Sequence, residues 1–372
     1  MSVLLRVVLD QLITETDPDL AMASGELARA LVQTAPSGCA VGAIVPTGRD
    51  LAIDGLAEVR RLGMGRRELA AAWQLGVTAG VGGGLIHSPT LLAPLTRHDR
   101  INEHDQTVVT LWDLLPWESP DELSRSTVAW HKGMLKRARK HADAVVVPTH
   151  AMAQRLEQVT GFAGRTRVIA GAPASDFAVP VDAIGRRRTL GIPETVIAVV
   201  GDTRASSALP VAFAAIAASG VDLPLVVLEA AEGQEPAIID MAEASGISGT
   251  RVHVRAEIDA ADRAAILDAS LLLVAPSRRV AFPWRVVEAM KLSVPVVAVA
   301  SPDHREVIVD GGAVVGDPED AESDAAALGD AIGQALATSR ALDRLGVLSG
   351  DRGRAFSWQV SADRVWQLHA DL

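Results

Sequence analysis

The stretch that decides the fold is APSRRVAFPWRVVEAMKLSVPVVAV, residues 275–299. It follows a run of buried-type residues, Leu271–Val274, that is typical of a strand, and it ends in a second such run, Val294–Val299. Between the two runs, Arg285–Leu292 has the spacing of an amphipathic helix. A strand, a helix and another buried strand form the repeating unit of parallel sheets that are covered by helices.

The same alternation extends in both directions along the chain and predicts an α/β fold with two doubly wound parallel sheets. Strands of the first half are expected at Leu4–Asp10, Ala40–Ile44, Leu85–Ile86, Val108–Leu111, Ala144–Val147 and Arg167–Ile169. Those of the second half are expected at Val196–Val200, Leu223–Leu228, Arg251–Val254, Leu271–Val274, Val294–Val299 and Gly312–Val315. The intervening helices include Gly25–Gln33, Ser124–His141, Leu209–Ala218, Pro236–Ala244, Ala260–Ala269 and Arg285–Leu292.

A length of 372 residues exceeds what one hydrophobic core usually serves, so two domains are expected. The segment GAPASDFAVPVDAIGRRRTLGIP is rich in Pro, Gly and Ala and has the composition of a linker. We therefore place the boundary near Phe177–Ile184, with a first domain at 1–178 and a second at 179–372.

The composition excludes several classes of function. The net charge is -11, which argues against nucleic-acid binding, and 49% of the residues are hydrophobic, which fits a well-packed globular protein. Cys39 is the only cysteine, so neither an intrachain disulfide nor a cysteine zinc site can form. No signal peptide pattern and no spanning apolar run is present, so we expect a cytoplasmic protein, with membrane contact at most peripheral.

Parallel sheets bind ligands beyond the carboxyl ends of their strands, and a cleft between two such domains is the default site. Gly80-Val81-Gly82-Gly83-Gly84 precedes its strand, which favours a flexible turn over a phosphate loop. Asp17-Pro18-Asp19 is interpreted as a solvated turn and not as a metal-binding pair, so no metal and no cofactor are predicted.

At this point the chain resembles the family-four retaining glycosyltransferases, which transfer a hexose from a nucleotide sugar. The likeness rests on segments in the family's order, namely VVLDQLI with GELARAL, VVTLWDLLPW, ADAVVVPTHAMAQRL, IDAADRAAILDASLLLVAPS with the donor motif, and AFSW. The resemblance implies the GT-B architecture, in which two Rossmann-like domains face each other across a cleft. It also implies that the final helix, 356–372, crosses back onto the first domain.

Polar positions of that family are replaced at several separate loops. Where the family carries a glycine-rich loop, this chain has Asp17-Pro18-Asp19-Leu20, which places acids and a proline where backbone NH groups would approach a phosphate. In the family a histidine that contacts the donor sugar precedes an aspartate. The histidine position is Trp112 in this chain, while the aspartate is present as Asp113, the catalytic candidate. The arginine and lysine that clamp the diphosphate fall at Asp202 and Ser207.

The donor motif itself has lost the first of its two glutamates. That position is Val280, whereas the second glutamate, which binds ribose hydroxyls in the family, is present as Glu288. As a structural residue, Glu288 would instead act as an acid in the first turn of its helix, and both interpretations stay open. One charge at about 4 Å contributes roughly 4 kcal/mol at an effective dielectric of 20, so the lost cations imply a donor affinity weaker by on the order of a thousandfold.

Other side chains near these turns are weaker candidates. Arg204, with Arg278 and Arg279, is the nearest substitute for the lost cations, although solvated charges at the rim of the site are favoured. Phe282 and His304 belong to donor-side loops, and for His304 a surface cap is favoured. His87 is interpreted as a cap more than as a sugar contact, and Trp112 and Trp284 as fillers of a vacated pocket more than as stacking partners.

The helix Ser124–His141 carries the cations Lys132, Lys136, Arg137, Arg139 and Lys140. A solvated charged face is favoured, and a site for anionic lipid or an acidic partner is the alternative.

These features lead to two hypotheses. The first is a pseudo-glycosyltransferase, a non-catalytic subunit or scaffold in glycan assembly that works with an active glycosyltransferase or with a second copy of itself. The alternative is an active, metal-independent retaining enzyme that moves a hexose such as mannose or glucose from a GDP- or UDP-sugar. For that alternative the resemblance implies that Asp113 and Glu288 place the acceptor and the ribose.

Overall fold

The computed structural model describes residues 3–78, 80–98, 105–256, 258–280, 282–317, 320 and 322–372. The chain forms two compact units. Unit 1 comprises Met1–Ser175 together with Ser357–Leu372, and unit 2 comprises Asp176–Phe356. The division thus falls three residues before the boundary that the linker composition suggests, and the last helix belongs to the same unit as the first strand.

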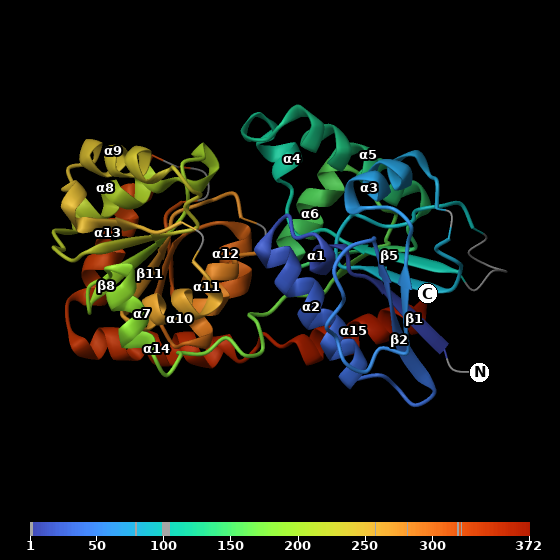
Figure 1. Ribbon diagram of the computed structural model, residues 1–372. Helices are drawn as coiled ribbons and strands as arrows, with labels where there is room; N and C mark the ends of the chain where they lie inside the picture. The colour runs from blue at the N-terminus through green and yellow to red at the C-terminus, as the bar shows by residue number, and fades with distance from the viewer. Residues whose placement is uncertain are drawn as a thin grey trace. The chain divides into compact units, whose positions relative to one another are not determined.

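Unit 1 is built on a seven-stranded parallel sheet in the order β3-β2-β1-β4-β5-β6-β7 (Figure 1). Its strands are β1 (Val3–Val8), β2 (Cys39–Val45), β3 (Glu58–Arg61), β4 (Leu85–Ser88), β5 (Gln106–Thr110), β6 (Ala144–Val147) and β7 (Thr166–Val168). Its helices are α1 (Asp10–Ile13), α2 (Pro18–Gln33), α3 (Arg66–Leu75), α4 (Leu115–Glu118), α5 (Arg125–His141), α6 (His150–Val159) and α15 (Trp358–Asp371). The chain reverses its direction of travel across the sheet between β1 and β4.

Unit 2 has a six-stranded parallel sheet in the order β10-β9-β8-β11-β12-β13. The strands are β8 (Val196–Val200), β9 (Leu225–Leu228), β10 (Val252–Val254), β11 (Ser270–Ala275), β12 (Val296–Val299) and β13 (Ala313–Val315). The helices are α7 (Ala183–Leu190), α8 (Leu209–Ser219), α9 (Glu235–Ala244), α10 (Ala260–Asp268), α11 (Trp284–Lys291), α12 (Pro302–Ile308), α13 (Asp324–Leu336) and α14 (Ser339–Gly353). Here the reversal lies between β8 and β11.

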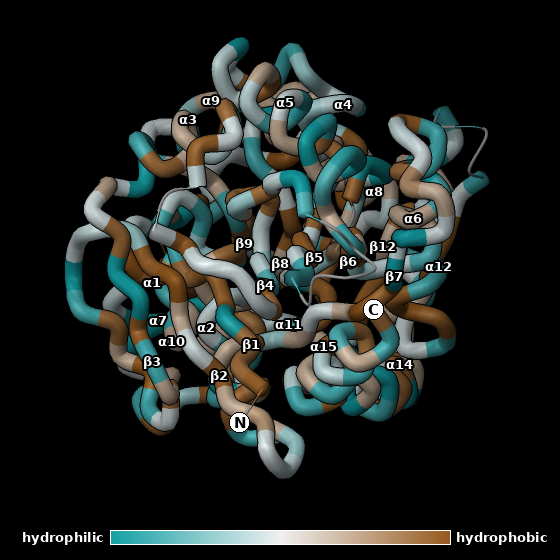
Figure 2. The backbone as a smooth tube through the Cα atoms, turned by 90° about the vertical axis from the view of Figure 1, so that its right-hand side faces the viewer, coloured by the Kyte–Doolittle hydropathy of each residue, from teal (hydrophilic) through white to brown (hydrophobic). Residues whose placement is uncertain are grey.

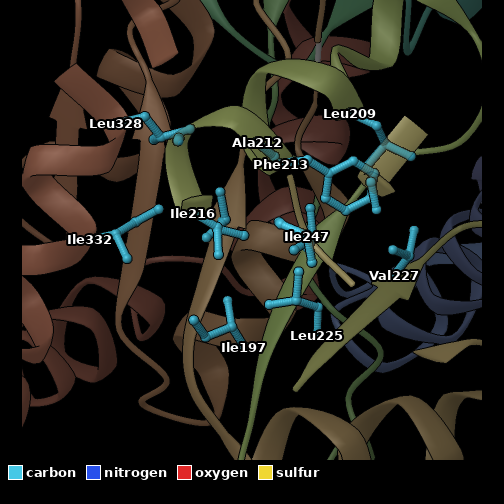
Figure 3. Close-up of a cluster of buried hydrophobic side chains, with 14 of the residues drawn as sticks. Ile197, Leu209, Ala212, Phe213, Ile216, Leu225, Val227, Ile247, Leu328 and Ile332 are labelled. Atoms are coloured by element: carbon cyan, nitrogen blue, oxygen red, sulfur yellow. The ribbon is translucent and has the colours of Figure 1, made fainter. Parts of the chain in front are cut away.

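The central strands are buried because they consist almost entirely of Val, Leu, Ile and Ala. Figure 2 shows β8, β9 and β12 in the brown of hydrophobic residues. In unit 2 the sheet packs against α8 and α13, and Phe213, Ile216 and Leu328 meet side chains of β8 and β9 in the core (Figure 3). Strands that are covered on both faces read as continuous apolar runs, which explains why the sequence reveals them.

Local differences from the expected elements have simple causes. The first strand ends at Val8, before the expected Asp10, because Asp10 begins the short helix α1. The Asp10 carboxylate forms an ion pair with Arg66, whose Nε lies 2.7 Å from Oδ2. The edge strand β3 was not expected, since its sequence EVRR has no apolar alternation. Within the part of the chain that the structure describes, no helix is long and apolar enough to cross a membrane.

Candidate functional site

A small pocket lies in unit 2 at the carboxyl ends of β8, β9 and β11, which is the reversal point of the sheet. Its volume is about 70 Å³. It is lined by Val200, Glu229, Ala275, Pro276, Ser277, Val280, Phe282, Pro283, Trp284, Arg285, Val286 and His304. Pockets that bury drug-sized ligands usually have volumes of roughly 300 to 1,000 Å³, several times the volume of this pocket.

Aromatic side chains account for much of this lack of space. Phe282 is buried, and its ring meets that of Trp284 edge to face with the centroids 4.5 Å apart. The Phe282 ring also meets that of Phe356 edge to face, with the centroids 6.2 Å apart. Pro283 precedes Trp284 and the start of α11, and Val280 lines the pocket with an apolar group. Trp284 is half-buried in this arrangement.

The loop after β8 is organised by Asp202, which stands where the resemblance expects an arginine. Its Oδ1 accepts hydrogen bonds from the backbone NH of Arg204 at 2.8 Å and from the Ser207 hydroxyl at 2.5 Å. Its Oδ2 accepts from Arg204 Nε at 2.6 Å. The guanidinium of Arg204, the candidate replacement cation, is therefore held by the carboxylate two residues before it.

Glu288 is a buried acid of unit 2 that is held by ion pairs. Its side chain is only 3% exposed, and both oxygens are engaged by arginines. Arg263 binds it in a bidentate manner, with Nη2 to Oε1 and Nε to Oε2 both at 2.8 Å. Arg285 donates from Nη1 to Oε2 at 2.7 Å and from Nε to Glu229 at 3.0 Å. The two oxygens of Glu288 thus accept three hydrogen bonds from two guanidiniums.

Neither Arg263 nor Arg285 was among the residues that the sequence singled out. Arg285 was within reach of that reasoning, because it precedes Glu288 by three positions on α11 and residues at that spacing share a helix face. Arg263 lies on α10, 25 positions before Glu288, and no sequence signal indicates that contact. The ring of Phe177 lies against the Arg263 guanidinium, 5.9 Å from centroid to Cζ.

His304 is buried in the first turn of α12 and lines the pocket. The cap of that helix is Ser301, whose hydroxyl accepts from the His304 backbone NH at 2.9 Å, so the cap expected at His304 is wrong by three residues. The ring Nδ1 donates to the Val299 carbonyl at 2.8 Å. Burial lowers the pKa of His304 to about 4, although the carbonyl partly offsets this, and the ring is neutral at pH 7.

Arg278 and Arg279 are the other two cations that the sequence offered as substitutes. Arg278 binds Asp324 through Nε and Nη2, each at 2.5 Å, and also donates to backbone carbonyls of Asp317 and Asp320. Arg279 is exposed. Arg278 thus joins its loop to Asp324 and to the loop before α13, and it is not the solvated rim charge that we expected.

In unit 1 the candidate residues do not converge on one point. Asp113 is exposed, and its Oδ1 accepts from the backbone NH of Leu115 at 2.9 Å, which stabilises the start of α4. Trp112 is buried, donates from Nε1 to the Pro89 carbonyl at 2.8 Å, and meets Trp358 of α15 with ring centroids 6.4 Å apart. Trp112 therefore fills the interior of unit 1.

His87 corrects another expectation, because it neither caps an element nor lies at a surface. It is fully buried within β4, and its ring lies 5.6 Å from that of His369 on α15. Burial, together with the neighbouring His369, holds the pKa of His87 well below its usual value.

At Asp17-Pro18-Asp19-Leu20, where the resemblance leads us to expect a glycine-rich phosphate loop, the side chain of Asp17 caps the start of α2. Asp17 Oδ1 accepts from the backbone NH groups of Asp19 and Leu20 at 2.9 and 3.0 Å, and Pro18 occupies the first turn of α2. A helix N-terminus is the natural position for a bound anion, and here a side-chain carboxylate occupies it. Among the described residues, no group of three His, Cys, Asp or Glu side chains is placed to hold a metal ion.

Comparison with known proteins places the geometry in context. Residues 194–337 match the family model for glycosyl transferases group 1. No curated protein matches the chain. Among solved structures, sucrose-phosphate synthase from Thermosynechococcus elongatus resembles it with a TM-score of 0.73 and 21% identity, over 99% of this chain and 98% of the other.

Two further structures are similar over the full length. HepE from Anabaena, solved in complex with UDP and glucose, has a TM-score of 0.70 and 15% identity, with 100% of both chains covered. The catalytic domain of starch synthase IV from Arabidopsis thaliana, bound to ADP and acarbose, has a TM-score of 0.67 and 14% identity over 100% of this chain and 99% of the other. Identities this low establish the fold alone, and they confirm the predicted GT-B architecture of two Rossmann-like domains.

Proposed function

We propose that this chain, whose residues 194–337 form a glycosyl transferases group 1 domain, is a non-catalytic member of the glycosyltransferases that serves as a subunit or scaffold in glycan assembly. The observation that carries the proposal is the state of Glu288. Both of its oxygens are bound by the chain's own arginines, so the one donor-site acid that the sequence retains is committed to an internal ion cluster.

The loop after β8 supports the same conclusion. A nucleotide sugar brings a diphosphate, and its departure requires cations that stabilise the developing negative charge. Asp202 presents a carboxylate there, and the nearby Arg204 is paired with it. Position 202 thus carries a negative charge where the resemblance implies a positive one. This weakens both the binding of the donor diphosphate and the stabilisation of the leaving group.

The small pocket is the third support. Phe282 and Trp284 pack against each other beside it, and the remaining volume is about 70 Å³. Opening it for a nucleoside would expose apolar rings to water, which costs roughly 25 cal/mol per Å² of apolar surface. A protein of this kind would act through its surface, on an active glycosyltransferase or on a second copy of this chain.

Calorimetric titration of the full chain with UDP, GDP, UDP-glucose and GDP-mannose tests the proposal. We expect no saturable heat up to about 1 mM ligand, which corresponds to a binding free energy weaker than about 4 kcal/mol. Circular dichroism of the same sample establishes that the protein is folded.

The variant Glu288→Gln distinguishes specific from incidental binding. Micromolar binding of one nucleotide by the wild type, with at least a tenfold loss in Glu288→Gln, would overturn the proposal and support an active transferase with a divergent donor site. Glu243→Gln, at an exposed position on α9, serves as the control for the loss of one negative charge.

A further inference from the structure

Helix α5 concentrates positive charge in a chain of net charge -11. It contains six Lys or Arg residues and no Asp or Glu. Lys132, Lys136 and Lys140, three of the chain's four lysines, follow one another at intervals of four residues, and all three are exposed. Residues four apart lie on the same side of a helix, so these three side chains form a continuous row, which we call the lysine ridge.

The stability of α5 does not account for this ridge. Cations in the last turn of a helix interact favourably with its dipole, which explains Lys140. Lys132 and Lys136 lie in the middle of α5, where this effect has faded. The helix is held to the core by other positions, the buried Met134, Leu135 and Ala138.

Two exposed apolar side chains lie next to α5. Leu75 at the end of α3 is 80% exposed, and Val77 just beyond it is 53% exposed. Helix α3 packs on α5, since Trp130 donates from Nε1 to the Ala70 carbonyl at 3.3 Å. Between Leu75 and Val77, Gly76 lies so close to Arg137 that a Cβ atom there would come within 2.7 Å of its guanidinium.

We propose that the lysine ridge, together with Leu75 and Val77, is a docking surface for a membrane that contains anionic phospholipids. Apolar side chains at such a surface enter the boundary between headgroups and acyl chains, while neighbouring lysines keep their ammonium groups at the level of the phosphates. Each lysine near an anionic leaflet adds an attraction that decays within a Debye length.

The identity of the cations favours lipid over an acidic protein. The chain contains 31 arginines and only four lysines, yet the ridge consists of lysines. Protein interfaces are enriched in arginine and depleted of lysine. A hydrated, flexible ammonium suits a fluid layer of phosphates, whereas the planar guanidinium suits fixed bidentate partners.

The overall negative charge does not oppose this contact. At physiological ionic strength the Debye length is about 8 Å, so charges on distant faces are screened from the membrane. The surface lies in unit 1 and shares no residue with the pocket of unit 2, so it stands or falls independently of the proposed function.

Flotation of the full chain with large vesicles tests the docking surface. The vesicles consist of phosphatidylcholine alone or with about 30% phosphatidylglycerol, a fraction that produces a negative surface potential. We expect binding to the anionic vesicles only. The variant Lys132→Gln, Lys136→Gln, Lys140→Gln should bind about a hundredfold more weakly, and Leu75→Ser with Val77→Ser about tenfold more weakly.

The matched control removes three exposed positive charges elsewhere, by Arg340→Gln, Arg344→Gln and Arg364→Gln, and should retain binding. An equal loss in this control would show a response to net charge alone and would overturn the proposal. Absence of wild-type binding to anionic vesicles would do the same. If soluble polyglutamate competes fully while the Leu75 and Val77 variant binds normally, the ridge recognises an acidic polypeptide and the lipid assignment is wrong.

Discussion

At the scale of single residues, Glu288 shows how neighbours decide the role of a side chain. The sequence left two roles open, a ribose contact and a structural acid. In the structure the carboxylate lies between Arg263 and Arg285, and all three side chains are at most 16% exposed. The contact with Arg263 could not be predicted from the sequence, because Arg263 reaches Glu288 from a different helix.

Replacing Glu288 by Ala should lower the free energy of unfolding of unit 2 by about 3 to 5 kcal/mol, because two guanidiniums would then stay buried without their carboxylate. Urea denaturation followed by circular dichroism measures this loss. The double variant Glu288→Met, Arg263→Met removes one charge of each sign and should recover part of it. A loss below about 1 kcal/mol in the single variant would mean that water or relaxation compensates for the missing acid.

At the scale of elements, α15 is held to unit 1 by polar contacts along its length. Trp358 donates to the Pro173 carbonyl at 3.1 Å, Trp366 to the Leu31 carbonyl at 3.2 Å, and Ser361 to the Ala170 carbonyl at 2.7 Å. The helical spacing of its apolar residues made the element predictable. The resemblance also placed this helix on the first domain, but its individual partners were not predictable, since they lie more than 180 residues earlier in the sequence.

The buried pair His87 and His369 should make the attachment of α15 sensitive to acid. Burial lowers the pKa of His369 to about 4, despite the opposing charge of Asp143. Burial, together with His369, holds the pKa of His87 well below its usual value. The unfolded chain takes up protons near pH 6.5 while the folded unit does not. The contribution of the two histidines to the stability of unit 1 is therefore constant above pH 6.5 and falls toward pH 4, by up to about 1.4 kcal/mol per pH unit for each histidine.

Hydrogen exchange of the α15 amides between pH 4 and 7, corrected for the intrinsic pH dependence of exchange, measures this effect. The variant His87→Phe should flatten the profile by the share of one histidine, whereas His150→Gln, at an exposed position on α6, should leave it unchanged. An identical profile for wild type and His87→Phe would exclude the histidine pair as the cause. His304 titrates in unit 2 and does not report on α15.

At the scale of the whole molecule, the two sheets were predictable and the site was not. Strands such as Val196–Val200 and Val296–Val299 are buried on both faces, so their apolar runs appear directly in the sequence. The state of the pocket depends on which side chains meet, such as Phe282 with Trp284 or Asp202 with Arg204. These side-chain contacts depend on loop conformations, which the hydrophobic periodicity of the sequence does not encode.

The division into two units predicts how the chain responds to the loss of α15. A chain that ends at Phe356 leaves the apolar partners of Trp358, Val365 and Trp366 uncovered, so unit 1 should unfold at lower denaturant concentration. Unit 2 contains none of the removed residues and should keep its protection. Hydrogen exchange resolved by peptide distinguishes the two, and equal loss of protection in both units would show that they unfold as one.

Unit 1 is assembled from two stretches of chain that are separated by the whole of unit 2. During synthesis on the ribosome, Asp176–Phe356 is therefore translated before α15. Unit 1 begins first along the chain but is completed only after unit 2. Until α15 is made, the face of α2 that α15 contacts stays uncovered. A nascent chain of this protein thus presents an apolar surface to chaperones for as long as about 180 residues take to translate, at roughly 5 to 20 residues per second.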